Sequence, residues 1–185
     1  TWNCNCPGTQ HVLSSVAVTS AGTAVYAQSV RFAVSATSTP PPPSSPPSSP
    51  PDPIGSSVLE PPWQQQAIGL VTVPGEVTEN GGVVAVMTAG SIGGAADQFP
   101  FVYQSLDGDG EIVARVEGLG AIDPWSHAGV MIRNGLTPSS FAVFAGLTGG
   151  NGWVVERRDG STSGLMATTS LPGAAGPGWV RLVRE

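Results

Sequence analysis

Short apolar runs alternate with turn-forming residues along the chain, and this pattern predicts many short β-strands. In residues 111–117, Ile112, Ala114 and Val116 share one strand face and the residues between them share the other. Glycine-rich turns separate such runs at intervals of about ten residues, which is typical of a sandwich or jelly roll. From residue 63 onward, the expected strands are 67–73, 82–88, 99–104, 111–118, 127–133, 140–147, 152–158, 165–169 and 178–184.

Two further strands are expected before a proline-rich segment. Residues 11–36 alternate in the same way around a turn at 19–23, but two strands do not make a stable domain. In residues 37–53, nine of the seventeen positions are proline, which cannot join a helix or a sheet ladder and favours extended polyproline II. We therefore expect a domain tail at 1–36, a linker at 37–62 and a β-domain at 63–185.

Composition and charge limit the helix content, the binding partners and the cellular location that we expect. With 25 glycines and 18 prolines the chain has little room for long helices. It contains no lysine and its net charge is −6, so it lacks the basic cluster that nucleic acid or an anionic membrane requires, and no apolar run is long enough for a membrane span. A serine- and proline-rich spacer is typical of extracellular proteins, so we expect a secreted or cell-surface location. Both ends read as strands, which predicts a fragment of a longer protein.

Several segments carry a family resemblance: "WQQQAIG", "GGAADQFPFVYQSLDGDGEIVARV", "WSHAGVMIRNGL", "FAVFAGLTGGNGWVVERRDG" and "PGWVRLVRE". Together they resemble bacterial modules of the concanavalin A-like lectin/glucanase superfamily (LamG-like), with Ala67 where that family often has aspartate. Residues 1–36 resemble the last strands of a bacterial Ig-like β-sandwich. The resemblance implies an antiparallel jelly-roll sandwich that lacks its C-terminal strands, preceded by the linker and a partial Ig-like domain. It also implies an accessory, often carbohydrate-associated, role in a secreted multidomain bacterial protein.

The stretch "SLDGDGEIVARV" gathers three acids, Asp107, Asp109 and Glu111. Calcium binding needs six to eight oxygen ligands, and the EF-hand pattern fails here because its fifth position is Glu111 and its sixth is Ile112. Aspartate–glycine repeats favour reversal between strands, so we interpret the segment as a hairpin turn. Calcium at these three acids is the alternative, and no other cofactor is expected.

No complete catalytic motif is present. A glycosidase needs two carboxylates facing one cleft, whereas Glu156 and Asp159 are three apart and so point to opposite faces of a strand. No nucleophile elbow occurs, and His127 is interpreted as a strand-edge residue. The leading hypothesis is therefore a non-catalytic module. The alternatives are part of a glycoside hydrolase and a purely structural, adhesin-like spacer.

Ligand candidates are aromatic and basic. Exposed tryptophan faces stack on sugar rings, and Trp125, in an expected loop, is the best such candidate, while Trp153 and Trp179 are expected in the core. Arg133 and Arg157 would add hydrogen-bond donors, or would lie on a solvated strand face. The partners expected are a glycan and neighbouring domains of the parent chain.

The two cysteines, Cys4 and Cys6, are disulfide candidates in an oxidising compartment. A bond between them would be strained, and partners in an upstream segment are the alternative. With His11 they form a pattern that lacks a fourth zinc ligand.

Overall fold

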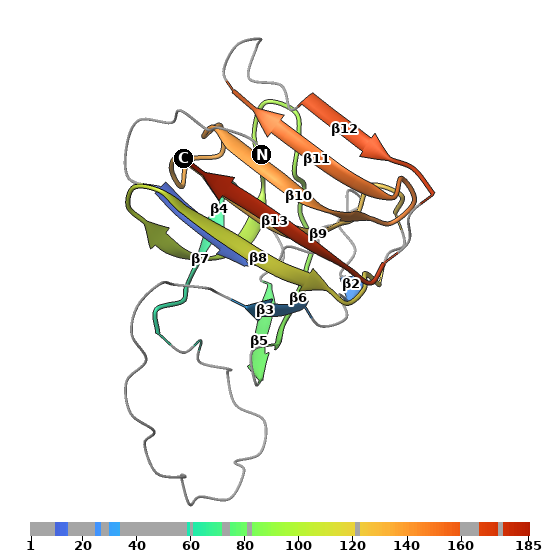
Figure 1. The fold of residues 1–185 in the computed structure, drawn as a ribbon, viewed down its shortest axis with the longest axis horizontal. Helices are drawn as coiled ribbons and strands as arrows, with labels where there is room; N and C mark the ends of the chain where they lie inside the picture. Colours follow the sequence, from blue (N-terminus) through green and yellow to red (C-terminus); the bar gives the residue numbers. More distant parts are fainter. Residues whose placement is uncertain are drawn as a thin grey trace, which may run out of the picture.

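The computed structural model describes residues 10–14, 25–26, 30–33, 59, 61–71, 75–80, 83–120, 123–159, 167–173 and 176–185. Its regular structure is entirely β, arranged as two sheets that face each other (Figure 1). The all-β prediction is confirmed. Within this described part, no helix has the length and apolar character needed to cross a bilayer.

The larger sheet has seven strands in the order β12-β11-β10-β9-β1-β7-β4. In that order the strands are β12 (Ala167–Leu171), β11 (Trp153–Arg158), β10 (Ala142–Thr148), β9 (His127–Arg133), β1 (Gln10–Ser14), β7 (Phe99–Leu106) and β4 (Gln64–Ile68). All neighbouring pairs in this sheet are antiparallel.

The smaller sheet runs in the order β13-β8-β3-β6-β2, and β5 also pairs with β6. These strands are β13 (Gly178–Arg184), β8 (Gly110–Val116), β3 (Val30–Ala33), β6 (Val83–Thr88), β2 (Val25–Tyr26) and β5 (Glu76–Asn80). The sequence pattern missed β5, because Val77 is its single buried apolar residue and the strand has no visible alternation.

Strands from before the proline-rich segment lie inside both sheets. β1 pairs with β7 and β9, and β3 pairs with β6 and β8. The Ig-like part of the expected architecture and the jelly-roll strand order are therefore not confirmed, and the position of the domain boundaries stays a prediction. Most of the linker, 37–58 and residue 60, lies outside the described residues.

Both faces of the larger sheet are buried along β7, β9 and β10. On the face toward the smaller sheet, Val130 and Leu147 pack against Ile112, Val116 and other residues of β8 and β13. On the opposite face a second apolar cluster contains residues of β4, β7, β9, β10 and β11: Ile68, Phe99, Phe101, Tyr103, Met131, Ala142, Phe144 and Val154. The side chains of this second cluster are thus shielded from solvent as thoroughly as those of the cluster between the sheets.

The acid-rich segment is not a hairpin, which corrects the interpretation from sequence. β7 ends at Leu106 in the larger sheet, and β8 begins at Gly110 in the smaller one. The segment therefore carries the chain from one layer to the other. Gly108 has φ +72°, a left-handed backbone conformation that glycine adopts at little cost.

Candidate functional site

An exposed tryptophan lies on a short loop before β9. Trp125 is 47% exposed, and its backbone N–H donates to Asp123 Oδ1 at 2.7 Å. The N–H of Ser126 donates to the carbonyl of Asp123 at 3.0 Å. These two bonds close a turn, so the loop presents the indole on a fixed backbone.

A glycine-rich loop after β10 holds the Trp125 loop in place. Gly149 N–H donates to Ser126 O at 3.0 Å, and Gly150 N–H donates to Pro124 O at 2.9 Å. The side chain of Asn151 also donates to Pro124 O, at 3.0 Å. A Cβ on Gly150 would lie 2.9 Å from Pro124, so only glycine lets the two loops approach this closely.

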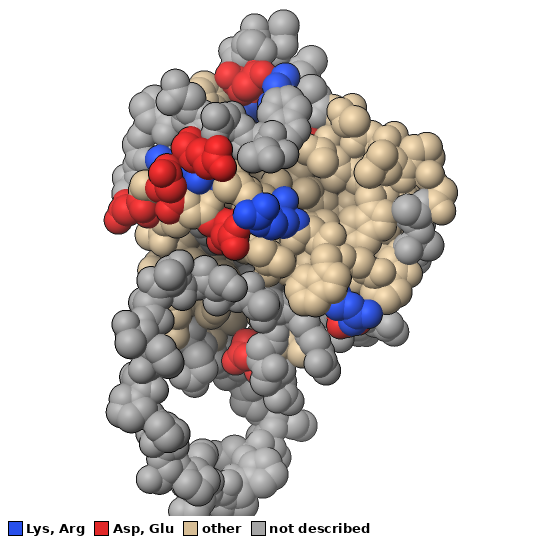
Figure 2. Space-filling model, viewed as in Figure 1, with Lys and Arg blue, Asp and Glu red and all other residues tan. Residues whose placement is uncertain are grey.

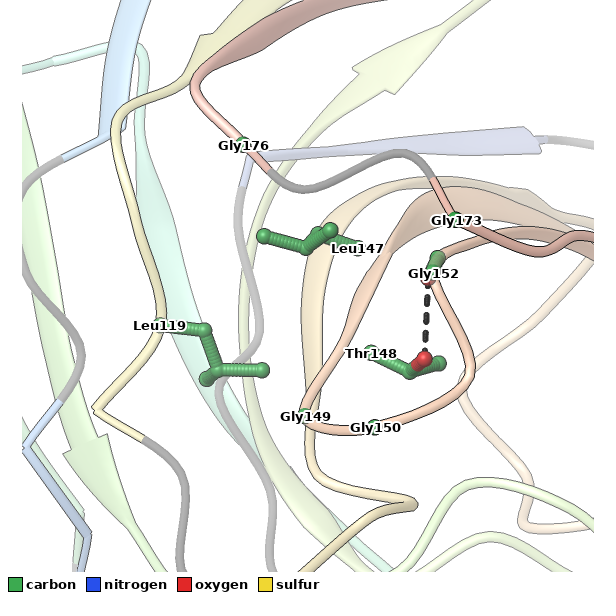
Figure 3. A pocket seen from close by; sticks show the side chains of 8 residues that line it. All are labelled: Leu119, Leu147, Thr148, Gly149, Gly150, Gly152, Gly173 and Gly176. Atoms are coloured by element: carbon green, nitrogen blue, oxygen red, sulfur yellow. Dashed lines mark hydrogen bonds between the residues drawn. The ribbon is translucent and has the colours of Figure 1, made fainter.

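Beside these loops lies a pocket of about 300 Å³ (Figure 3). Its lining is Leu119, Leu147, Thr148, Gly149, Gly150, Gly152, Gly173 and Gly176. Thr148 Oγ1 donates to Gly152 O at 2.8 Å and accepts from Asn151 N–H at 2.9 Å, which closes the loop around the pocket. Ligand pockets start at roughly this volume, so the space suits one small ring. Its apolar floor and glycine backbone give a ring both a face and polar partners.

A buried histidine and carboxylate lie below Trp125, on the outer face of the larger sheet. His127 Nε2 is 3.2 Å from Glu156 Oε2, and both side chains are almost fully buried. The two atoms are close but not aligned, and neither makes a hydrogen bond among the described residues. Glu156 Oε1 accepts from Thr168 Oγ1 at 3.1 Å. The imidazole also meets the edge of the Phe144 ring, 5.3 Å between centroids. His127 is the first residue of β9, in agreement with its interpretation as a strand-edge residue, and it is buried there.

Arg133 lies at the other end of β9 from Trp125. At about 3.3 Å per residue the strand separates the two ends by roughly 20 Å. Arg133 is 1% exposed, and its guanidinium donates to the carbonyls of Gly135 (2.7 Å) and Thr137 (2.6 Å). The N–H groups of Arg133 therefore already donate to acceptors within the protein. The structure does not bring Arg133 and Trp125 into one site.

Arg133 belongs to a buried cluster that sequence reasoning missed. Arg158 makes two parallel hydrogen bonds to Asp97, at 2.7 and 2.8 Å, and Arg133 adds a third to the same carboxylate at 3.2 Å. The three side chains are fully buried. The cluster contains two cations and one anion, and the Arg133 guanidinium lies 5.5–5.8 Å from the ring centroids of Phe99 and Phe101. The aromatic faces therefore share in balancing the excess positive charge.

Burial lowers the pKa of Arg133, and the neighbouring charge of Arg158 lowers it further, while Asp97 acts in the opposite direction. A cation whose pKa is lower in the folded state favours unfolding at every pH below that pKa. At neutral pH the fold therefore carries the full desolvation cost of Arg133, and Asp97 is the charged group that offsets part of it.

The remaining sequence candidates lie apart. Arg157 is half-buried and pairs with Asp159 at 3.1 Å. Glu111 accepts from Arg181 Nε at 2.8 Å, while Asp107 and Asp109 are exposed. In the described part of the chain, no three His, Cys, Asp or Glu side chains come together as a metal-ligating group. Cys4 and Cys6 lie outside the described residues, as does the side chain of His11.

Comparison with known proteins adds no relative. No family model matches the chain, and neither a curated protein nor a solved structure does.

Proposed function

We propose that this chain is a non-catalytic accessory module of a secreted multidomain bacterial protein, and that it binds carbohydrate at the Trp125 loop. The observation that carries the proposal is an exposed indole on a loop hydrogen-bonded to the wall of a glycine-lined pocket. A pyranose ring offers C–H groups to an aromatic face and hydroxyls to backbone N–H and C=O groups. The loop that carries the indole is hydrogen-bonded to Gly149 and Gly150, which line the pocket, so an aromatic face and polar backbone groups come from two adjoining loops.

The acids support binding over hydrolysis. Glu156 is buried against His127, whereas Asp159 is exposed and paired with Arg157. Two carboxylates in such different surroundings do not face one cleft, which a glycosidase pair requires. Presentation of neighbouring domains is compatible with binding, because a bound glycan would anchor whatever the module carries.

A glycan array probed with the full chain tests the proposal. The Trp125→Ala variant is expected to bind at least tenfold more weakly than wild type, a loss of about 1.4 kcal/mol. Trp179→Ala is the matched control, because Trp179 is also an exposed tryptophan (63%) but lies on β13, outside the loop that carries Trp125. Lack of retention of the wild type on every glycan would refute binding. Equal losses in the two variants would refute the location.

A further inference from the structure

The two sheets differ in width at one edge of the sandwich. β13 is the last strand of the smaller sheet, and it lies over β9 and β10. The larger sheet continues past β10 with β11 and β12, which extend beyond β13 (Figure 1). β11 and β12 thus form a ledge that, among the described strands, no strand of the smaller sheet covers.

Burial along β11 agrees with this ledge. Val154 and Glu156 point to the outer face of the larger sheet and are buried, whereas Trp153 and Val155, which point toward the smaller sheet, are only half-buried. In a sandwich the face between the sheets is normally the better buried one. In β11 the outward-facing side chains are instead the more buried ones, which shows that the inner face of this strand is only partly covered.

The ledge and the edge of β13 enclose a mainly apolar slot of about 340 Å³. Leu171 is directly opposite Trp153 in the pairing of β11 with β12, so both lie on the floor. The Trp153 ring reaches across to Gly178, where a Cβ would clash with it, and so closes one end. Leu171 is 66% exposed and Trp179 is 63% exposed, which corrects the expectation that Trp179 is in the core.

The surface around the slot is almost free of charge. Figure 2, in the view of Figure 1, shows a broad uncharged area on the side where β10, β11 and β12 lie. Arg181 lines the slot, and its guanidinium is already paired with Glu111. A charged segment would therefore lose hydration at the slot without gaining an opposite charge.

The unpaired edge of β13 supplies backbone hydrogen-bonding groups at one side of the slot. The strand has seven residues, and its pairing to β8 uses one edge over the full length from Gly178 to Arg184. No described strand pairs with the other edge. Backbone N–H and C=O groups along such an edge are a template for another strand. A strand added at the usual spacing of about 4.8 Å would lie over the ledge.

We propose that the slot binds one extended, uncharged peptide segment of a partner protein, which adds to β13 as a further antiparallel strand. Alternate side chains of that segment are apolar and point onto Trp153, Val155 and Leu171, while its backbone pairs with β13. The inserted strand completes the cover of the ledge and brings the inner face of β11 to full burial.

The ledge argues against a second copy as the occupant. Edge-to-edge antiparallel pairing of two β13 strands places a twofold axis normal to the smaller sheet. Both larger sheets would then lie on the same side of the joined sheet. Because each extends past its own β13, β11 and β12 of the two copies would occupy the same space. A single strand has no such layer behind it and fits.

A synthetic peptide tests this binding mode. The probe is a neutral peptide of about eight residues with alternating valine and threonine, and the control peptide has proline at two central positions, which removes ladder donors. Hydrogen exchange of the β13 amides in the full chain is the readout. Only the alternating peptide is expected to protect them.

Matched variants locate the site. Leu171→Arg is expected to weaken peptide binding at least tenfold, whereas Leu70→Arg, at a residue 75% exposed near β4, leaves it unchanged. Thr169→Arg is a second exposed position on the slot, should the first variant fold poorly. Absence of protection in the wild type, equal protection by the proline peptide, or equal effects of the Leu171 and Leu70 variants would overturn the proposal. Concentration-dependent dimerisation that Leu171→Arg abolishes would overturn it in favour of a second copy.

Discussion

Removal of the Asp97 carboxylate is the sharpest test of how the larger sheet is held together. Asp97→Asn keeps the size of the side chain and removes its charge. In the native cluster the carboxylate accepts both Arg158 bonds, at 2.7 and 2.8 Å, and the Arg133 bond at 3.2 Å. It also accepts from the N–H of Gly93 at 3.2 Å. The variant leaves two buried guanidinium groups with no anion between them.

The structure sets the size of the effect. Breaking a buried ion pair by removing one partner costs about 3–5 kcal/mol, because the other charge stays buried without compensation. Here one deletion leaves two charges, so the upper part of that range is expected. Natural domains are stable by about 5–15 kcal/mol, so the loss is a large fraction of the total. The asparagine amide would retain one acceptor oxygen, and the Arg133 contacts with Phe99 and Phe101 would remain. These interactions limit the loss in the free energy of unfolding.

Urea unfolding of the full chain, followed by tryptophan fluorescence, measures this loss as a shift in midpoint. Asp159→Asn is the matched control, because Asp159 also pairs with an arginine, at 3.1 Å, but is 41% exposed, and surface pairs contribute at most about 1 kcal/mol. We expect Asp97→Asn to exceed the control by at least about 2 kcal/mol. If the two variants lose the same stability, the buried cluster does not hold the fold, and the reasoning is wrong.

Two further predictions follow from the glycines and the acidic turn. Gly146→Ala is expected to cost about 1–3 kcal/mol by overpacking, because its Cβ would clash with the Ala128 carbonyl and the Phe144 ring. Gly108→Ala, where φ is positive but no atom is near, is expected to cost only about 1 kcal/mol in the same urea assay, and the reverse order would contradict the packing argument. The melting temperature is expected to be the same in EDTA and in added calcium. A rise with calcium that is lost in Asp109→Asn would instead establish a site at the acidic turn.

Strand positions could be predicted where alternation and burial coincide. The expected strands 127–133 and 178–184 match β9 and β13, because both carry regular apolar positions between clear turns. β4 was expected at 67–73 but spans Gln64–Ile68, since three exposed glutamines at a sheet edge carry no apolar signal. Backbone pairing with β7, which is non-local, decided that boundary.

Only part of the functional and buried polar residues could be predicted from the sequence. Trp125 could be singled out because it lies between turn residues and outside any apolar run. The Asp97 cluster could not, because Asp97 is in a loop and its partners Arg133 and Arg158 end strands 36 and 61 positions later. From sequence alone, an arginine at the end of a strand is predicted to be exposed to solvent, because the loop that buries it is not known. Arg133, which has no acidic residue near it in the sequence, was the one available signal.

The sequence by itself determined that the chain is all-β, where most strands lie and that the molecule is acidic, because alternation, turn chemistry and charge are local properties of the residues. Only the tertiary structure decided that β1 and β3 complete sheets built from residues beyond the linker, and that residues 107–109 join the two layers. It also decided that the smaller sheet ends at β13, so that β11 and β12 of the larger sheet extend beyond it. These features depend on which strands pair across long separations, and pairing follows from the burial of whole faces rather than from any segment alone.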